Sequence, residues 1–244
     1  MKVAICGRNL DDLFPLLAEL PLEIDGENPD VVVSYGGDGS LLGAERAFPG
    51  VPKCPLRDWR NNPKCPVHDE RHVLTALVEG TLSETRICTL EGVTDDGRTV
   101  AGINDVCVGK QNITSAVRFR LWFNNKLHKN QIVGDGLVIA TPFGSTGYYR
   151  NITRSSFHLG LGVAFNNSSV PLDHLVVPES TSIRIEILRG PAVLLADNSP
   201  DRVELEKGQF VTIRTRPEQT HILGLDIFRC PDCYRLREDG VTTR

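Results

Sequence analysis

The sequence predicts an α/β protein in two parts, an N-terminal doubly wound α/β domain and a C-terminal antiparallel domain resembling a β-sandwich. Strand-like and helix-like patterns alternate over the first eighty residues, whereas alternating apolar and polar residues separated by glycine turns dominate after residue 82. Two glycine-rich turns, at 36–40 and 144–148, each follow a strand-like run. The first part therefore reads as a parallel sheet with helices, and the second as packed antiparallel sheets.

The N-terminal elements follow from apolar spacing. The run Val31–Tyr35 is β-branched and unbroken, as expected of a strand buried on both faces. Apolar residues at helical spacing behind Asn9, a candidate N-cap, predict a helix over 9–20. The other predicted elements are strands at 2–6, 22–24 and 51–56 and helices at 40–48 and 69–79.

The second part is predicted to be mostly strands separated by turns such as Asp95-Asp96-Gly97. The predicted strands are 86–90, 100–108, 116–123, 132–140, 182–188, 192–196, 210–214 and 221–228. This gives an N-terminal domain over 1–81, completed by the C-terminal segment, a β-rich domain over 82–228 and a loosely held tail over 229–244.

Composition narrows the functional class. The chain has 244 residues, a net charge of -4 and 40% hydrophobic residues. The negative charge argues against a nucleic-acid partner, because binding phosphates along a strand requires clustered Lys and Arg. No apolar run is long enough to predict a membrane span, and the chain enters a strand directly without a signal-peptide core. We therefore expect a cytoplasmic protein without a membrane partner.

Four of the seven cysteines lie in sequence patterns that can bind a metal or form a redox pair. Cys54 and Cys65 each lie in a Lys-Cys-Pro triplet, with His68 and His72 close behind the second, and Cys230 and Cys233 form a C-x-x-C. Such residues can bind zinc, form a redox pair or be buried thiols. Because the spacing lacks two paired C-x-x-C motifs, these alternatives stay open and no metal ligand is assigned.

The first glycine turn has the chemistry of a phosphate site. Gly36, Gly37 and Gly39 let backbone N–H groups approach an anion, and the positive end of the following helix favours phosphate. Asp38 in such a turn can bind Mg²⁺ or accept a proton from an attacking hydroxyl. The alternative is a tight turn whose aspartate only caps the helix. The buried strand before the turn favours the phosphate site.

The second turn offers hydroxyls and an aromatic ring at a strand-to-helix junction. Thr146 can bind ribose or phosphate or cap the helix, and Tyr148 can stack on adenine or pack in the core. Asp135 either contacts a ligand or belongs to a turn. Asn104 and Asp105, polar residues inside a strand-like run, can bind the adenine edge and ribose hydroxyls or mark a bulge.

Taken in order, four motifs resemble those of the ATP-dependent NAD kinase family: Gly36 to Gly39, Asn104-Asp105, Gly134 to Tyr148 and Val176 to Ile185. The resemblance implies an active site between the two domains. It also implies transfer of the ATP γ-phosphate to the 2′-hydroxyl of the adenosine ribose of NAD, giving NADP. Mg²⁺ or another divalent metal, the small-molecule partners NAD and ATP, and a homo-oligomer (dimer or tetramer) are implied with it.

The same resemblance implies residue roles. Asp38 would be the catalytic acid that activates or positions the 2′-hydroxyl. The residues implied in binding are Gly36, Gly37, Gly39 and Ser40 for the phosphates, Asn104 and Asp105 for the adenosine part of NAD, and Asp135, Thr146, Gly147, Tyr148 and Asn151 for the rest of the dinucleotide site.

Several positions depart from the family pattern. Asp105 stands in place of Glu, Gly147 in place of Ala, and residues 54–60 in place of a glycine-rich loop. The segment Tyr149–Arg154 and the triplet Asp197–Ser199 also differ. These changes touch the dinucleotide pocket more than the phosphate turn. Two alternatives therefore stay beside NAD kinase: a related kinase with another acceptor alcohol, and an NAD(P)-binding sensor without turnover.

Overall fold

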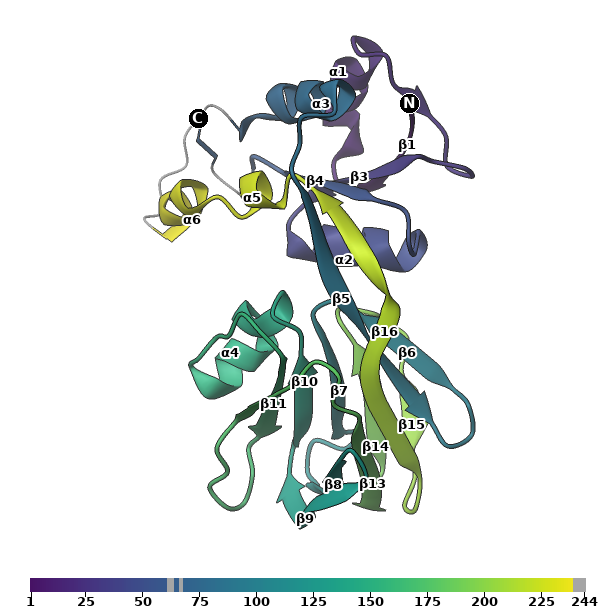
Figure 1. Cartoon of the computed structure of the whole chain (residues 1–244), viewed down its shortest axis with the longest axis vertical. Helices are drawn as coiled ribbons and strands as arrows, with labels where there is room; N and C mark the ends of the chain where they lie inside the picture. The colour runs from purple at the N-terminus through teal and green to yellow at the C-terminus, as the bar shows by residue number, and fades with distance from the viewer. Residues whose placement is uncertain (61–63, 66–67, 239–244) are drawn as a thin grey trace. The chain divides into compact units, whose positions relative to one another are not determined.

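A computed structural model describes residues 1–60, 64–65 and 68–238 (Figure 1). Contacts within the chain divide it into two compact units. Unit 1 contains Met1–Ile87 and the chain from Gln219 onward, and unit 2 contains Cys88–Glu218. The chain therefore passes between the units within two long strands. Unit 1 includes the described part of the segment 229–244, which the sequence pattern sets apart as a tail.

Unit 1 contains a parallel sheet in the order β2-β1-β3-β4, continued by the end of β16 beside β4. Its elements are β1 (Lys2–Gly7), α1 (Phe14–Ala18), β2 (Glu23–Ile24), β3 (Val31–Gly36), α2 (Asp38–Ala47), β4 (Lys53–Arg57), α3 (Glu70–Glu79) and the end of β16 (Phe210–Leu223). In β3, Val33 packs in the cluster that includes α1 and α3, whereas Val32 packs with Ala44 of α2. Helices therefore cover both faces of the sheet, and the predicted doubly wound α/β fold is confirmed.

The predicted helix over 9–20 is shorter in the structure. A 3-10 turn at Leu10–Asp12 precedes α1, which carries a proline in its first turn. Asn9 has φ 55° and forms no cap; its side chain instead donates to Asp58 Oδ2 at 2.8 Å. The predicted Asn9 cap is therefore wrong, because the left-handed backbone and the contact with Asp58 orient the side chain away from the N–H groups that a cap oxygen would accept from.

Unit 2 is a sandwich of two sheets. Its elements are β5 (Glu84–Thr94, which begins in unit 1), β6 (Thr99–Gly102), β7 (Asp105–Lys110), β8 (Val117–Phe123), β9 (Lys126–Gly134), β10 (Gly136–Ala140), α4 (Tyr148–Thr153), β11 (Leu161–Asn166), β12 (Leu175–Val177), β13 (Ile183–Arg189), β14 (Ala192–Ala196) and β15 (Val203–Leu205). One sheet has the order β12-β11-β10-β7-β14-β15. The other has the order β16-β13-β8-β9, with β5 beside β16 and β6 beside β5.

The sandwich core lies between alternating inward residues of these sheets. Val108 and Ile139 come from one sheet, and Phe119, Ile185 and Val211 come from the other; all five belong to one buried cluster. Neighbouring strands in each sheet of unit 2 are antiparallel where register is defined. The predicted C-terminal β-sandwich is therefore confirmed.

Three predicted strands are wrong in part. The runs 100–108 and 132–140 each divide into two strands, at Ile103-Asn104 and at Asp135. The second break precedes Gly136, at φ +150°, where an added Cβ would lie 2.2 Å from the carbonyl oxygen of Val108. The predicted strand 221–228 ends at Leu223, and α5 (Leu225–Phe228) and α6 (Pro231–Glu238) follow.

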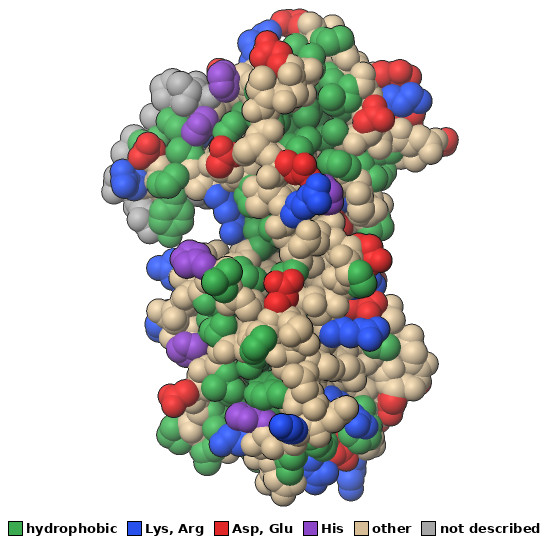
Figure 2. Space-filling model, viewed as in Figure 1, with side chains coloured by type: hydrophobic (Ala, Val, Ile, Leu, Met, Phe, Trp, Pro, Cys, Tyr) green, Lys and Arg blue, Asp and Glu red, His purple; other side chains and the backbone are tan. Residues whose placement is uncertain are grey.

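The surface carries charges of both signs. On the face shown in Figure 2, acidic and basic side chains are interspersed rather than gathered by sign. Among the helices in the described part of the chain, none has the length and apolar character needed to cross a membrane.

Candidate active site

The first glycine turn joins β3 to α2 in unit 1, as the sequence predicts. Gly36 has φ +144°, and an added Cβ there would lie 2.2 Å from Ser40 Oγ. The Ser40 N–H donates to the Gly37 carbonyl at 3.0 Å, and Gly39 is exposed. Asp38 is the first residue of α2, and its side chain is 45% exposed. The turn thus presents a carboxylate beside the N-terminus of a helix.

Two arginines that the sequence reasoning missed flank Asp38. Arg57 Nη1 lies 3.4 Å from Asp38 Oδ2, and Arg229 Nη2 lies 3.7 Å from Asp38 Oδ1. Arg57 is buried; its Nε donates to the Phe228 carbonyl at 3.1 Å and its guanidinium stacks 3.8 Å from the Phe228 ring centre. Burial lowers the pKa of Arg229, and the Asp38 carboxylate opposes that change. The carboxylate therefore lies in a locally positive environment.

Strand order carries a signal for Arg57. Arg57 ends β4, whose register places it opposite Gly36 at the end of β3. Because the carboxyl ends of adjacent parallel strands meet at one sheet edge, a polar residue there is a site candidate. Arg229 carries no comparable signal, since it follows α5 and lies far along the chain from β3.

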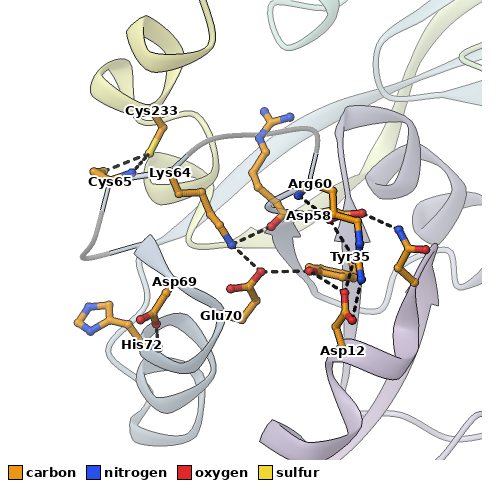
Figure 3. A network of polar contacts seen from close by, with 12 residues as sticks. Asp12, Tyr35, Asp58, Arg60, Lys64, Cys65, Asp69, Glu70, His72 and Cys233 are labelled. Atoms are coloured by element: carbon orange, nitrogen blue, oxygen red, sulfur yellow. Dashed lines mark hydrogen bonds and ion pairs between the residues drawn. The ribbon is translucent and has the colours of Figure 1, made fainter. Parts of the chain in front are cut away.

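A polar network surrounds the end of β4 (Figure 3). Tyr35 donates its hydroxyl hydrogen to Glu70 Oε1 at 3.1 Å, and Lys64 Nζ donates to the same oxygen at 2.5 Å and to the Arg57 carbonyl at 3.0 Å. Asp58 is buried and accepts a hydrogen bond from the Arg60 N–H at 3.0 Å. Burial, and then the Glu70 carboxylate, raise the pKa of Tyr35 well above its ordinary value. The network fixes the backbone that carries Arg57.

In unit 2, Asn104 and Asp105 lie between β6 and β7 around the side chain of Asp197. That carboxylate accepts hydrogen bonds from the backbone N–H groups of Ile103 at 2.9 Å, Asn104 at 2.8 Å and Asp105 at 3.1 Å. Asn104 Oδ1 is buried and has no hydrogen-bond partner in the described ranges. An unpaired buried carbonyl oxygen is costly, so it is a fitting acceptor for a ligand donor.

The second glycine turn packs directly on Asn104. The Thr141 N–H donates to the Asn104 carbonyl at 2.9 Å, and the Thr141 hydroxyl donates to the Ile103 carbonyl at 2.6 Å. The Gly144 N–H donates to Thr141 Oγ1 at 3.1 Å, and an added Cβ at Gly144 would lie 2.1 Å from the Asn104 oxygen. The structure therefore brings together two segments that the sequence reasoning treated separately. Thr141 and Gly144 belong to the predicted second turn but were given no role of their own, and Asp197 was not among the predicted site residues.

The other predicted dinucleotide residues lie at the start of α4 or beside β10. Tyr148 accepts a hydrogen bond at its hydroxyl from Asn166 Nδ2 at 2.9 Å, and Tyr148, Asn151 and Asn166 line one pocket. Burial, then Cys107, then the carboxylates of Asp105 and Asp135 raise the pKa of Tyr148.

Asp135 forms an ion pair with Lys110 at 2.7 Å and accepts a hydrogen bond from Asn167 Nδ2 at 3.1 Å. The contact with Lys110 is the main cause that lowers the pKa of Asp135. Thr146 is exposed, and the Gly147 N–H donates to the Gly144 carbonyl at 2.9 Å. Thr146 therefore faces solvent, while Gly147 closes the turn.

Asp105 gives this site a pH dependence that stability measurements can detect. Burial and then the neighbouring Asp197 carboxylate raise the pKa of Asp105 to about 6. A free carboxyl titrates near 3.9, so the folded protein holds this proton more tightly than the unfolded chain. The contribution of protonated Asp105 to the stability of the fold is fully present below about pH 4 and is lost as the pH rises through about 6. As the pH rises from 4.5 to 7.5, the free energy of unfolding of the parent chain should therefore fall relative to that of Asp105→Asn, by on the order of 2 kcal/mol.

Urea unfolding at the two pH values measures this difference. The matched control is Asp201→Asn, which alters an exposed carboxylate in the same unit. An equal change in stability for both variants across the pH range would contradict the assignment.

Comparison with known proteins identifies the family. Residues 103–225 match the family model described as the ATP-NAD kinase C-terminal domain. The chain belongs to the ATP-NAD kinase family. The resemblance drawn from the four motifs is thereby confirmed. The matched residues include Asn104 and Tyr148.

Individual relatives agree with this assignment. An NAD kinase of Brucella melitensis is 25% identical to the chain, covering 80% of it and 78% of the relative. The crystal structure of an Archaeoglobus fulgidus NAD kinase in complex with ATP has a TM-score of 0.78 at 18% identity, covering 96% of this chain and 99% of that one. A yeast NADH kinase complexed with NADH has a TM-score of 0.81 at 14% identity, with coverage of 98% and 86%. These two structures show that the fold is shared.

Proposed function

We propose that this chain is an ATP-dependent NAD kinase, which transfers the γ-phosphate of ATP to the 2′-hydroxyl of the adenosine ribose of NAD and makes NADP. Membership of the ATP-NAD kinase family supports a phosphotransferase with an alcohol acceptor. The observation that carries the mechanism is Asp38, placed at the start of α2 between the guanidinium groups of Arg57 and Arg229.

In the proposed reaction the 2′-oxygen of the ribose attacks the γ-phosphorus. The new O–P bond forms as the bond from that phosphorus to the bridging oxygen of ADP breaks, and ADP leaves with the electron pair. The Asp38 carboxylate accepts the hydroxyl proton. Arg57 and Arg229 offset negative charge on the phosphates, and the turn at Gly36, Gly37, Gly39 and Ser40 lets the phosphates approach its backbone and the Ser40 hydroxyl.

Magnesium fits this site as part of its nucleotide substrate. A protein-held Mg²⁺ usually has one or two carboxylate ligands together with phosphates and water. Two guanidinium groups already flank the Asp38 carboxylate, and the buried Asp58 carboxylate beside the turn accepts from the Arg60 N–H. We therefore propose that the divalent metal arrives bound to the phosphates of ATP.

The acceptor side rests on the residues around Asn104. Its buried, unpaired Oδ1 suits the amino group of adenine, and the Asp105 carboxylate suits ribose hydroxyls. Tyr148 and Asn151 offer further contacts from their shared pocket. Asp135, Thr146 and Gly147 belong to the same proposed binding set but do not line that pocket. An active site between the domains, a cytoplasmic location and a homo-oligomer stay predictions.

A coupled assay with ATP, Mg²⁺ and NAD tests the proposed function. We expect NADP to accumulate in step with ADP, in equal amounts. NAD binding without turnover would instead indicate a sensor. ATP consumption with another alcohol, in the absence of NAD binding, would indicate a kinase with a different acceptor. Either of these two outcomes would overturn the proposal.

A further inference from the structure

Four potential metal-ligating side chains gather in unit 1. Cys65 and His68 lie between β4 and α3, whereas Cys230 and Cys233 lie at the start of α6. Figure 3 shows Cys65 beside Cys233, although 168 positions separate them in the sequence. The four ligand atoms all lie within 4.8 Å of one another.

One distance in the cluster equals the sulfur–sulfur edge of a zinc tetrahedron, and two others are shorter. Cys65 Sγ lies 3.8 Å from Cys230 Sγ, 3.1 Å from Cys233 Sγ and 3.0 Å from His68 Nδ1. Zn–S bonds of about 2.3 Å in a tetrahedron place sulfur atoms about 3.8 Å apart. A disulfide needs sulfur atoms about 2.05 Å apart, and none of the seven cysteines, all within the described ranges, forms one. The four ligand atoms are therefore gathered closely enough to share one ion, and the cysteines among them are not joined by a disulfide.

Backbone N–H groups donate hydrogen bonds to the sulfur atoms, as they commonly do around metal-bound thiolates. The Cys65 N–H donates to Cys233 Sγ at 3.2 Å, and the N–H groups of Asp232 and Cys233 donate to the Cys230 sulfur. Hydrogen bonds of this kind orient thiolate ligands and stabilise their charge. Cys230 and Cys233 are buried, which keeps two of the sulfur atoms from solvent, while Cys65 and His68 are partly exposed and leave a path for a metal.

The C-terminal helix needs an anchor of this kind. In α6, Cys233 is buried, whereas Pro231, Asp232, Tyr234 and Arg235 are exposed. A helix of 8 residues is unstable alone and is normally held by an apolar face. Among residues 231–236, Leu236 is half-buried and Cys233 is buried, so the sulfur cluster supplies a contact that can fix the start of α6.

We propose that Cys65, His68, Cys230 and Cys233 bind one structural zinc ion. Three thiolates and one imidazole form a closed tetrahedral set, which suits zinc and leaves no position open for catalysis. The ion ties α6 to the segment after β4. The sequence alone did not distinguish these residues from Cys54 and His72. Cys54 is buried in the sheet core and His72 is exposed on α3, so neither joins the cluster.

Metal analysis of the full chain tests this assignment. The protein is expressed in zinc-containing medium, dialysed without chelator and analysed for metal by mass spectrometry. We expect one zinc per chain, and cobalt substitution should give the absorption of tetrahedral Co²⁺ with thiolate ligands. His68→Gln and Cys65→Ser should weaken zinc binding by at least about a hundredfold, because loss of a ligand exceeds the usual effect of losing a supporting contact. His72→Gln, which changes an exposed histidine four positions away, is the matched control.

A second measurement covers variants that fail to fold. Removing zinc from the parent chain with a chelator should speed proteolysis within α6, and added Zn²⁺ should restore protection. Four results would overturn the proposal: no zinc in the reduced protein together with no cobalt uptake, zinc retained at full affinity in both ligand variants, a different metal bound, or a disulfide among these cysteines. None of these readouts depends on kinase activity, so a failure of the proposed function leaves the zinc test intact.

Discussion

Asp38→Asn is expected to lower kcat for NADP formation by at least about a hundredfold, while the KM values for NAD and ATP change little. The amide has nearly the shape of the carboxylate, but it does not accept the proton of the 2′-hydroxyl. The site keeps Arg57 and Arg229, whose positions depend on the Phe228 contacts and on burial as well as on Asp38. The loss should therefore fall on the chemical step.

Steady-state kinetics and calorimetric titration with NAD, on the same preparations, separate a loss in the chemical step from a loss in NAD binding. Asp11→Asn is the matched control, since it changes an exposed aspartate in the same unit that lies outside the proposed site. Undiminished kcat in Asp38→Asn would exclude Asp38 as the base. A large loss of NAD affinity with normal kcat would assign it to binding instead.

Gly144→Ala is expected to weaken NAD binding by at least about tenfold and to lower the free energy of unfolding by roughly 1–3 kcal/mol. The new Cβ would lie 2.1 Å from the Asn104 carbonyl oxygen and 2.6 Å from its Cα, so the backbone of one of these segments must move. That movement displaces the buried Oδ1 that we propose as the adenine acceptor. It also disturbs the hydrogen bonds of Thr141 to Ile103 and Asn104.

Calorimetric titration with NAD and urea unfolding measure the two consequences. Gly26→Ala is a suitable control because an added Cβ there meets nothing within 4 Å. If Gly144→Ala binds NAD as tightly as the parent chain, the turn does not position Asn104 for the ligand. If its stability is also unchanged, the close packing itself is contradicted.

The sequence predicted best those structural features that depend on a short segment. The turn from Gly36 to Ser40 joins a buried strand to a helix, and each part of that junction has a local pattern. The arginines beside Asp38 were missed because they reach it from β4 and from beyond α5. Asp197 was noted only as a departure from the family, although its carboxylate binds three backbone N–H groups at Asn104.

The positions of strands and helices were also predictable from local sequence, but the residues at which they end were predicted less accurately. Apolar periodicity reports which face of an element is buried, and that gave both layers of the fold. The breaks at Asn104 and Asp135 interrupt strands without interrupting the apolar pattern. They arise from contacts with other strands, such as the close approach of Gly136 to Val108.

The sequence by itself determined the fold class, the glycine turn that carries Asp38 and the family, because these depend on local spacing and on short motifs. Tertiary structure decided which distant side chains meet: Arg57 and Arg229 at Asp38, Asp197 at Asn104, and the cysteine–histidine cluster. Partners so far apart leave no periodic trace, since each contact depends on how the strands order and how the last helices return to the first sheet. Cys54 and Cys65 share the same triplet, yet only the folded chain separates a core thiol from a metal ligand candidate.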